Sequence, residues 1–278
     1  MARFARVDRR LLVSAVVLAA IVAYALLVPW LAGVDDRLTN FADARLAPSA
    51  EHWFGTDNAG RDLFVRVAAG LRVSLLIAAV CAVASTVLGT GIGVAAATFG
   101  GWTDRIVMRA VDGINALPHL LLGIVIVALF RGNIPAIIAS IALTHWTQVA
   151  RIARSEVLGV RGREYVDAAH LAGAGRWHVM RHHLAPAAAG QALIAVVLLL
   201  PHAIWHETTL SFLGLGLPPH QPSLGTLLQE ARSTLLLGGW WALVFPSLLL
   251  VAATLAVAGI GATLRDRISP PILERAPR

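Results

Sequence analysis

Residues 164–173 read Glu164-Tyr-Val-Asp-Ala-Ala-His-Leu-Ala-Gly173, and the polar stretch continues to His182-His-Leu-Ala-Pro186. This stretch separates two long apolar segments of a chain that otherwise has the composition of a membrane protein. Its charged and helix-forming residues indicate an ordered loop rather than a simple connection. An ordered polar loop between apolar segments predicts a surface on which a soluble protein docks.

The composition around this loop favours a lipid bilayer as the solvent. The chain has 278 residues, of which 57% are hydrophobic and 14% are charged, whereas soluble domains carry about 25% charged residues. A net charge of +7 would suggest nucleic acid in a soluble protein, but in a membrane protein it reflects arginines that fix cytoplasmic loops. We therefore expect no nucleic-acid partner. The single cysteine, Cys81, excludes a disulfide within the chain.

Six apolar segments are long enough to be candidate membrane helices, which need about 20 residues each. They are residues 11–31, 73–99, 113–131, 134–150, 187–212 and 241–263. The first segment follows four arginines, as a signal peptide would. Its length, and the absence of a small-residue cleavage site after it, favour a retained membrane helix instead.

The arginines predict how these helices are oriented. If the N-terminus lies inside, the segments 1–10, 100–112, 151–186 and 264–278 are cytoplasmic and hold 16 arginines, whereas the outer segments hold 7. Such an excess is typical of the cytoplasmic side. Residues 32–72 and 213–240 then lie outside the cell, and residues 151–186 form a cytoplasmic loop. The predicted fold is all-α: one membrane domain, residues 1–278, with six transmembrane helices and both termini inside.

Two features of the apolar segments limit what the chain can do. Gly89, Gly91 and Gly93 predict that another helix closely approaches the second segment. The chain contains no lysine, and it therefore lacks the lysine of a phosphate-binding loop. Energy for uphill transport would have to come from a partner or from an ion gradient.

The polar loop resembles the "EAA" loop of ABC importer permeases. The match consists of Asp167-Ala-Ala, then Gly173, His183 and Pro186, with Asp167 in place of the usual glutamate and Ala185 in place of a leucine. Gly173 permits a sharp turn between two helices, and Pro186 suits the start of the next helix. The resemblance implies that short helices insert into an ATPase subunit. The residues expected to form this coupling loop are Glu164, Asp167, Ala168, Ala169, Gly173, His183 and Pro186.

Four further segments resemble the dipeptide/oligopeptide/nickel permeases, in particular their second permease subunit. They begin at His52-Trp-Phe-Gly-Thr-Asp, Gly100-Gly-Trp-Thr-Asp, Ser211-Phe-Leu-Gly-Leu-Gly and Trp240-Trp-Ala-Leu-Val-Phe-Pro. The resemblance implies a non-enzymatic cell-membrane protein that binds no cofactor itself. It also implies a homologous permease partner, two cytoplasmic ATPase subunits that use ATP, and an extracytoplasmic binding protein.

The histidines bear on the cargo. His202 and His206 are four residues apart on one predicted helix, so both rings lie on one face, and imidazole is a suitable ligand for nickel, copper or zinc. Nickel permeases resemble this sequence in carrying a histidine pair there, whereas peptide permeases are usually apolar. We therefore expect nickel or another transition-metal ion or chelate as cargo, with a di- or oligopeptide importer as the alternative. An equally simple interpretation is that the pair bonds to neighbouring helices.

Other polar residues are weaker candidates for the translocation path. His119 and His145 lie within apolar segments, where polar groups usually face the bundle interior or a water-filled path. Glu207, beside His206, would join a metal site in a membrane hydrolase, but such an enzyme needs a third ligand and an open position for water. A gradient-driven carrier or an exporter is a third class, although no internal repeat supports it. Asp57, Arg61 and Asp62 could form a gate or a salt-bridged cap on the outer face, and we favour the cap.

Overall fold

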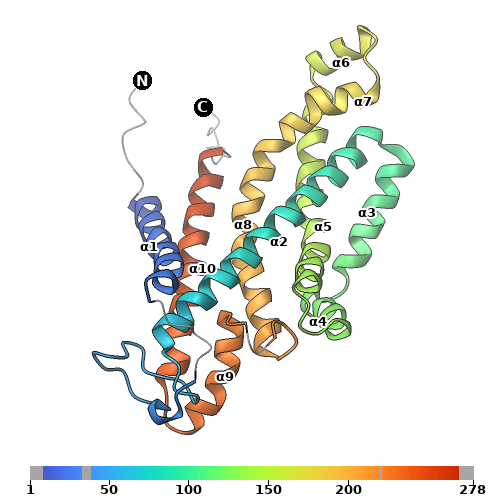
Figure 1. The fold of residues 1–278 in the computed structure, drawn as a ribbon. Helices are drawn as coiled ribbons and strands as arrows, with labels where there is room; N and C mark the ends of the chain where they lie inside the picture. The colour runs from blue at the N-terminus through green and yellow to red at the C-terminus, as the bar shows by residue number, and fades with distance from the viewer. Residues whose placement is uncertain (1–8, 33–38, 219–220, 269–278) are drawn as a thin grey trace, which may run out of the picture.

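The computed structural model describes residues 9–32, 39–218 and 221–268, and these residues are mainly helical (Figure 1). The helices are α1 (Arg9–Ala32), η1 (Phe41–Asp43), α2 (Leu63–Phe99), α3 (Gly101–Asn115), α4 (His119–Leu129), α5 (Ile134–Arg161), α6 (Glu164–Leu171), α7 (Arg176–Val179), a π-helical turn η2 (Met180–Leu184), α8 (Ala185–Phe212), α9 (Leu224–Leu236) and α10 (Trp241–Ile268). Within these ranges the one β feature is an isolated bridge between Thr56 and Asp62. The all-α prediction is confirmed for this part of the chain.

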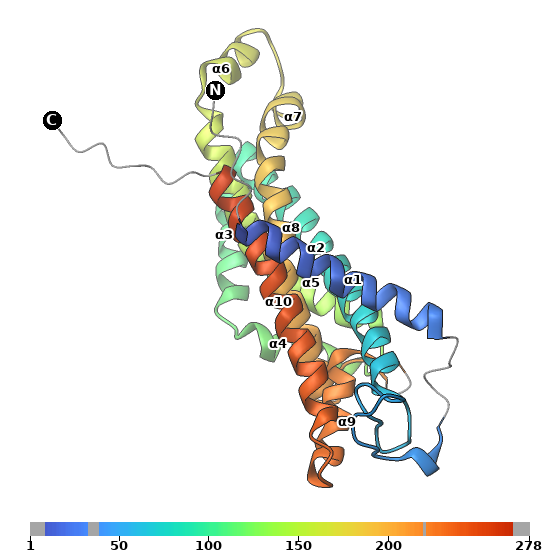
Figure 2. The same cartoon turned by 90° about the vertical axis from the view of Figure 1, so that its left-hand side faces the viewer.

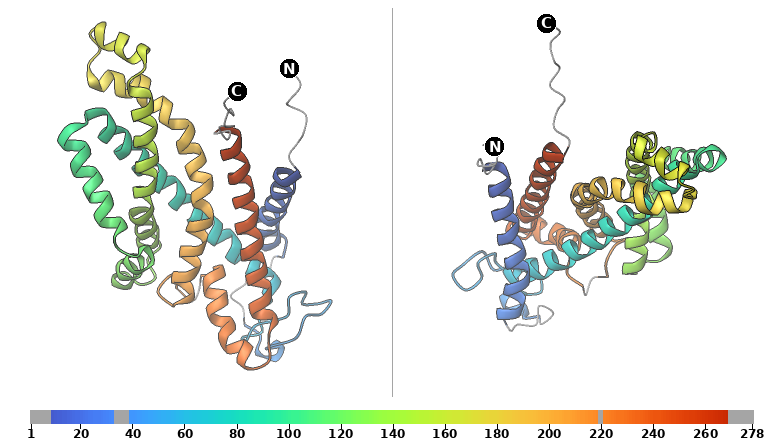
Figure 3. Two further views of the ribbon diagram at one scale, coloured as in Figure 1. Left: turned by 180° about the vertical axis from the view of Figure 1, so that it is seen from behind. Right: turned by 90° about the horizontal axis from the view of Figure 1, so that it is seen from above.

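Helix α2 is the central element of the fold. It begins where the Asp62 carboxylate accepts hydrogen bonds from the backbone N–H groups of Phe64 and Val65, as an N-cap residue does. Its 37 residues span about 55 Å, which exceeds the roughly 30 Å hydrocarbon core of a bilayer. Seen from above, α2 links α1 and α10 on one side with α5 and the α6–α7 region on the other (Figure 3). It packs against α5, α8 and α1.

Two of the three glycines within residues 89–93 of α2 explain its close contact with α5. A Cβ atom added at Gly89 would lie 2.5 Å from the carbonyl oxygen of Trp146, and one added at Gly93 would lie 2.3 Å from that of Ala150. Gly91 has nothing within 4 Å of such an atom. The predicted close approach is therefore confirmed at Gly89 and Gly93 and does not extend to Gly91.

The segment expected to cross as one helix, residues 113–131, is instead broken. Helix α3 ends at Asn115, α4 begins at His119, and the two helices meet at an angle of 84°. Pro118 explains the break, because it disfavours a helical conformation in the residue before it. The stretch 100–112, expected as a loop, belongs mostly to α3. Helix α5 continues to Arg161, well beyond the expected end of its membrane segment at residue 150.

Four helical segments of the described chain are long and apolar enough to cross a membrane: Arg9–Ala32, Leu63–Phe99, Arg176–Phe212 and Trp241–Arg267. The bent pair α3 and α4 becomes a fifth if it counts as one crossing. The chain is thus a polytopic membrane protein, and the count of six crossings stays a prediction.

The polar elements gather at the two ends of the helix bundle. Figure 2 shows α6 at one end and α9, with the segment before α2, at the other. The first residues of α1 and the last residues of α10 point toward the α6 end (Figures 1 and 2). Five arginines that carried the orientation argument lie outside the described residues, namely Arg3, Arg6, Arg37, Arg275 and Arg278.

Candidate functional site

The polar loop folds into a helical hairpin, residues 164–179, that projects from the end of the bundle. Helix α6 ends at Leu171, Gly173 adopts a φ of +89°, and α7 begins at Arg176. A positive φ is easily reached only by glycine, so the turn predicted at Gly173 is confirmed. The π-helical turn then leads into α8, where Pro186 occupies the first turn as expected.

An apolar cluster fixes this hairpin to the bundle. Val166 of α6 and Val179 of α7 are 0% and 1% exposed, and they pack with Val94, Val157 and other residues of α2, α5 and α8. Burial of a valine stabilises by about 1.5 kcal/mol or more. The hairpin is therefore a rigid projection, because both of its helices are anchored to the bundle.

Polar contacts complete the base of the hairpin. The Arg161 guanidinium donates to the carbonyl oxygen of Ala97 at 2.9 Å, and a ring nitrogen of His170 lies 3.2 Å from the carbonyl oxygen of Ala174. A hollow of about 390 Å³ lies between these groups and Thr98. The first contact joins the end of α5 to the end of α2, and the second closes the turn of the hairpin. The apolar cluster is what connects the hairpin to both helices.

The outer surface of the hairpin is open. Glu164, Asp167 and Ala168 are exposed and Ala169 is half-buried. The side chain of His183 lies against Tyr165, with ring centroids 5.9 Å apart. Two large apolar side chains of the hairpin are also exposed: Leu171 is 90% exposed and Trp177 is 65% exposed. Exposed apolar groups on a polar projection mark a site of protein contact, and Leu171 and Trp177 were not predicted from the sequence.

The structure brings four histidines together from three helices. His145 of α5 is central: its ring centroid lies 4.7 Å from that of His206, 5.7 Å from that of His119 and 6.4 Å from that of His202. His202 and His206 of α8 thus share one helix face, as their spacing predicts. His145 is buried, His119 and His206 are half-buried, and His202 is exposed. We name this group the histidine cluster.

Glu207 does not join the histidine cluster. Its side chain is 0% exposed and accepts hydrogen bonds from the hydroxyls of Ser74, at 2.7 Å, and Ser211, at 2.8 Å. Adjacent residues of a helix do not share a face, so Glu207 faces α2 and α9 while His206 faces α5. Glu207 is therefore buried on the other side of α8 from the histidine cluster, and its part in the translocation path stays a prediction.

The hydroxyls that bind Glu207 also reach the chain after α8. Ser74 accepts a hydrogen bond from the backbone N–H of Leu224, at the start of α9, and Ser211 accepts one from that of Leu217. The carboxylate is thereby the centre of a buried polar junction among α2, α8 and α9. A membrane hydrolase using His202, His206 and Glu207 has no support in this geometry. Among the described residues, no three histidine, cysteine or acidic side chains are arranged to hold a metal ion.

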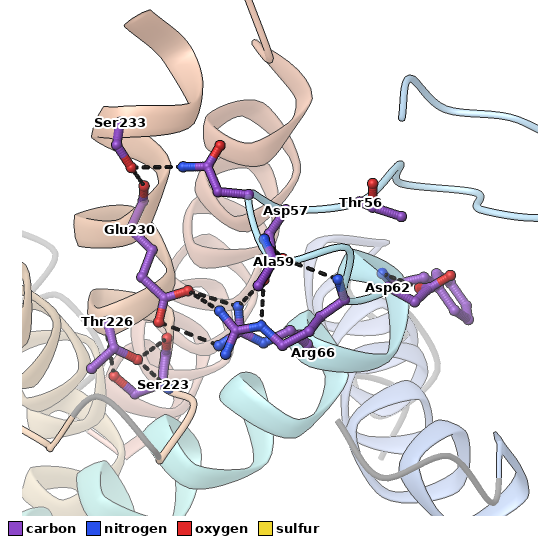
Figure 4. Close-up of polar contacts among 12 residues, drawn as sticks. Thr56, Asp57, Ala59, Asp62, Arg66, Ser223, Thr226, Glu230 and Ser233 are labelled. Atoms are coloured by element: carbon purple, nitrogen blue, oxygen red, sulfur yellow. Dashed lines mark hydrogen bonds and ion pairs between the residues drawn. The ribbon is translucent and has the colours of Figure 1, made fainter. Parts of the chain in front are cut away.

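The opposite end of the bundle holds a network of ion pairs (Figure 4). The Arg66 guanidinium of α2 lies 2.5 Å from Asp57 Oδ2 and 2.7 Å from Glu230 Oε2 of α9. Arg61 pairs with the same two carboxylates, at 2.7 and 2.9 Å. Asp62 instead caps α2 and contacts His52 at 2.8 Å. The expected pairing of Asp57 with Arg61 is confirmed, whereas Asp62 lies outside this network.

Two members of this network were not predicted. Arg66 looked like part of an outer loop but is 2% exposed inside α2, and Glu230 is distant in sequence. The signal for Arg66 was its position four residues after the capping residue Asp62, one helical turn into α2. Glu230 had no comparable signal, because its partners are set by how α9 folds back on α2.

Comparison with known proteins covers almost the whole chain. Residues 89–269 match the family described as "Binding-protein-dependent transport system inner membrane component". A putative peptide transport system permease protein of Brucella suis is 36% identical over 258 residues, which is 93% of this chain and 86% of the relative. The oligopeptide transport system permease protein OppC of Bacillus subtilis is 34% identical over 98% of this chain and 88% of its own.

The dipeptide transport system permease protein DppC of Bacillus subtilis is 35% identical over 84% of this chain and 73% of its own. These relatives are named for peptides, so the comparisons do not support the expectation of nickel as cargo and favour the peptide alternative. The segments that suggested the family from sequence lie in or before the matched range. The chain therefore belongs to the inner-membrane permease components of binding-protein-dependent ABC transport systems, as a multi-pass protein of the plasma membrane.

Proposed function

We propose that this chain is a permease subunit of a di- or oligopeptide importer. The observation that carries the proposal is the match of 84–98% of the chain to permeases named for peptide, dipeptide and oligopeptide transport. Permeases of this family are not themselves catalytic. The chain would bind no cofactor and would supply half of the path that peptides take through the membrane.

The partners follow from the family and from the exposed hairpin. A homologous permease would complete the path, two cytoplasmic ATPase subunits would use ATP, and an extracytoplasmic binding protein would deliver the peptide. The hairpin 164–179 would enter a cleft in one ATPase, with Leu171 and Trp177 as its apolar contacts and Glu164 and Asp167 as its polar ones. The coupling role of Ala168, Ala169, Gly173, His183 and Pro186 is part of this proposal.

The orientation is also part of the proposal. Six crossings with both termini inside would place the hairpin in the cytoplasm and the ion-pair cap outside. This orientation is supported by the excess of arginines in the predicted cytoplasmic segments, and by the start of α1 and the end of α10 pointing toward the hairpin.

Mechanically, the hairpin would act as a lever. ATP binding would draw the two ATPases together and move the two hairpins with them. Because Val166 and Val179 pack against α2, α5 and α8, this motion would reach the helices that carry the histidine cluster. The path would then open outward, and hydrolysis would reset it.

The direct test is reconstitution. The complete complex is reconstituted into liposomes that enclose ATP. The binding protein and a radiolabelled tripeptide are added outside, and the peptide that enters the liposomes is measured. We expect ATP-dependent peptide accumulation that stops when this subunit is omitted. Accumulation of nickel but not of peptide would refute the peptide assignment while leaving the family intact.

A further inference from the structure

Two rings of the histidine cluster contact backbone carbonyl oxygens of their own helices. His145 Nδ1 is 3.0 Å from the carbonyl oxygen of Ile141, and His202 Nδ1 is 3.3 Å from that of Leu198. A carbonyl oxygen can only accept, so Nδ1 is the donor in these two contacts, and His145 Nδ1 also lies 2.9 Å from the Thr144 hydroxyl. In an imidazole whose single proton is on Nδ1, the Nε2 atom is the hydrogen-bond acceptor.

These Nε2 atoms point away from the helices that carry them. The two nitrogens of an imidazole lie on different sides of the ring, so the binding of Nδ1 to its own backbone turns Nε2 outward. The ring of His145 has those of His119, His202 and His206 as neighbours, with ring centroids 5.7, 6.4 and 4.7 Å away. The cluster therefore offers hydrogen-bond acceptors on both α5 and α8.

The acidic residue that follows the cluster in sequence does not compete for a bound cation. Glu207, the acidic residue next to His206, is turned to Ser74 and Ser211 on the other side of α8. A group that donates several N–H bonds and carries positive charge fits a set of imidazole acceptors. A primary ammonium has three donors and binds acceptors at about 2.8–3.0 Å.

The cluster is also accessible from one side. His145 forms its buried floor at 5% exposed, whereas His202 is exposed and His119 and His206 are half-buried. The exposed side is formed by α4 and α8, which pack together with α5. A cargo molecule moving along this side would meet His202 first and His145 last.

We propose that the histidine cluster binds the primary ammonium group at the N-terminus of a peptide as the peptide crosses the membrane. The inference rests on the proposed peptide transport, and it names the part of the peptide that this subunit recognises. Loss of one hydrogen bond to a charged group lowers transport efficiency by about tenfold.

The test compares leucine and glutamine at the same positions in the complete reconstituted importer. H145L and H202L remove the acceptor, whereas H145Q and H202Q keep an amide oxygen that can accept. We expect the leucine variants to lose about tenfold in uptake of a free tripeptide and the glutamine variants to lose about threefold or less. Leu193→Ala, an exposed change on α8 outside the cluster, is the control for general damage. ATPase activity without peptide reports correct assembly.

A second arm uses the same tripeptide with its amino group acetylated. Because this peptide has no ammonium group, the leucine variants should transport it as well as the unchanged protein does. Equal losses for both peptides, or equal losses for leucine and glutamine, would show a structural role and overturn the inference. Unchanged uptake of the free peptide in H145L and H202L would do the same. If the unchanged importer carries no peptide, the proposed function fails and this inference fails with it.

Discussion

The contact between α2 and α5 makes a quantitative prediction at Gly93. In Gly93→Ala the new methyl carbon would lie 2.3 Å from the Ala150 carbonyl oxygen and 3.0 Å from the two backbone carbons of the same residue. All three atoms belong to the backbone of α5, so the helices must separate to relieve the overlap. Overpacking of this kind destabilises a protein by about 1–3 kcal/mol. Alanine stabilises a helix by about 0.5–1 kcal/mol relative to glycine, which offsets part of this cost.

The matched control is Gly91→Ala, two residues away on the same helix, where nothing lies within 4 Å of the new atom. This variant should gain the helix contribution without the overlap, so the two variants should differ by the overlap cost alone, about 1–3 kcal/mol. For a chain of this size 1 kcal/mol moves the unfolding temperature by about 2–4 °C. Thermal unfolding of the purified complex, followed by tryptophan fluorescence, measures the difference. Equal unfolding temperatures for the two variants would refute the packing argument.

Three further predictions concern other parts of the molecule. Arg66→Met should destabilise the protein, because it breaks a buried ion pair. The expected cost is about 3 kcal/mol, the lower end for such a change, since Arg61 still pairs with the two carboxylates. The exposed control Arg72→Met should change the unfolding temperature by about one degree or less. Glu207→Leu should cost about 1–3 kcal/mol, because it leaves two buried hydroxyls without their acceptor, whereas Glu207→Gln should retain most of the stability, and denaturation of the two variants side by side decides this. Leu171→Asp should abolish peptide-driven ATP hydrolysis and uptake without changing the unfolding temperature, and normal coupling in this variant would exclude Leu171 from the docking surface.

Local chemistry explains what the sequence predicted well. A glycine between two short helices predicts a turn, and Gly173 adopts the positive φ that such a turn requires. The spacing of His202 and His206 places them on one helix face, and both rings contact His145. The apolar segments predicted a polytopic all-α membrane protein. Each of these features depends on residues that are close together in the sequence.

Features that depend on distant residues were not predictable. The meeting of His119 and His145 with the pair on α8 requires the packing of three helices, which no local pattern specifies. Glu207 looked like a ligand because it follows His206, yet a single step along the helix turns it toward Ser74. Glu230 joins Arg66 only because α9 returns to α2.

The break between α3 and α4 has a local cause that an apolarity pattern does not register. Residues 113–131 are apolar enough to predict one crossing. Hydropathy, however, does not show where the helix axis changes direction. Pro118 changes the direction of the chain by disfavouring helix in the residue before it, and the resulting bend is 84°. The proline was visible in the sequence, but hydropathy outweighed it in the prediction.

The most direct measurement of the proposed function is peptide uptake in cells that express the whole transport system with and without this subunit. Radiolabelled tripeptide and radiolabelled nickel are supplied in parallel, each at a low external concentration, and a restored copy of the gene serves as the control. We predict that removal of the subunit abolishes peptide uptake, leaves nickel uptake unchanged, and is reversed by the restored copy. Unchanged peptide uptake together with lost nickel uptake would contradict the assignment of peptides as the cargo.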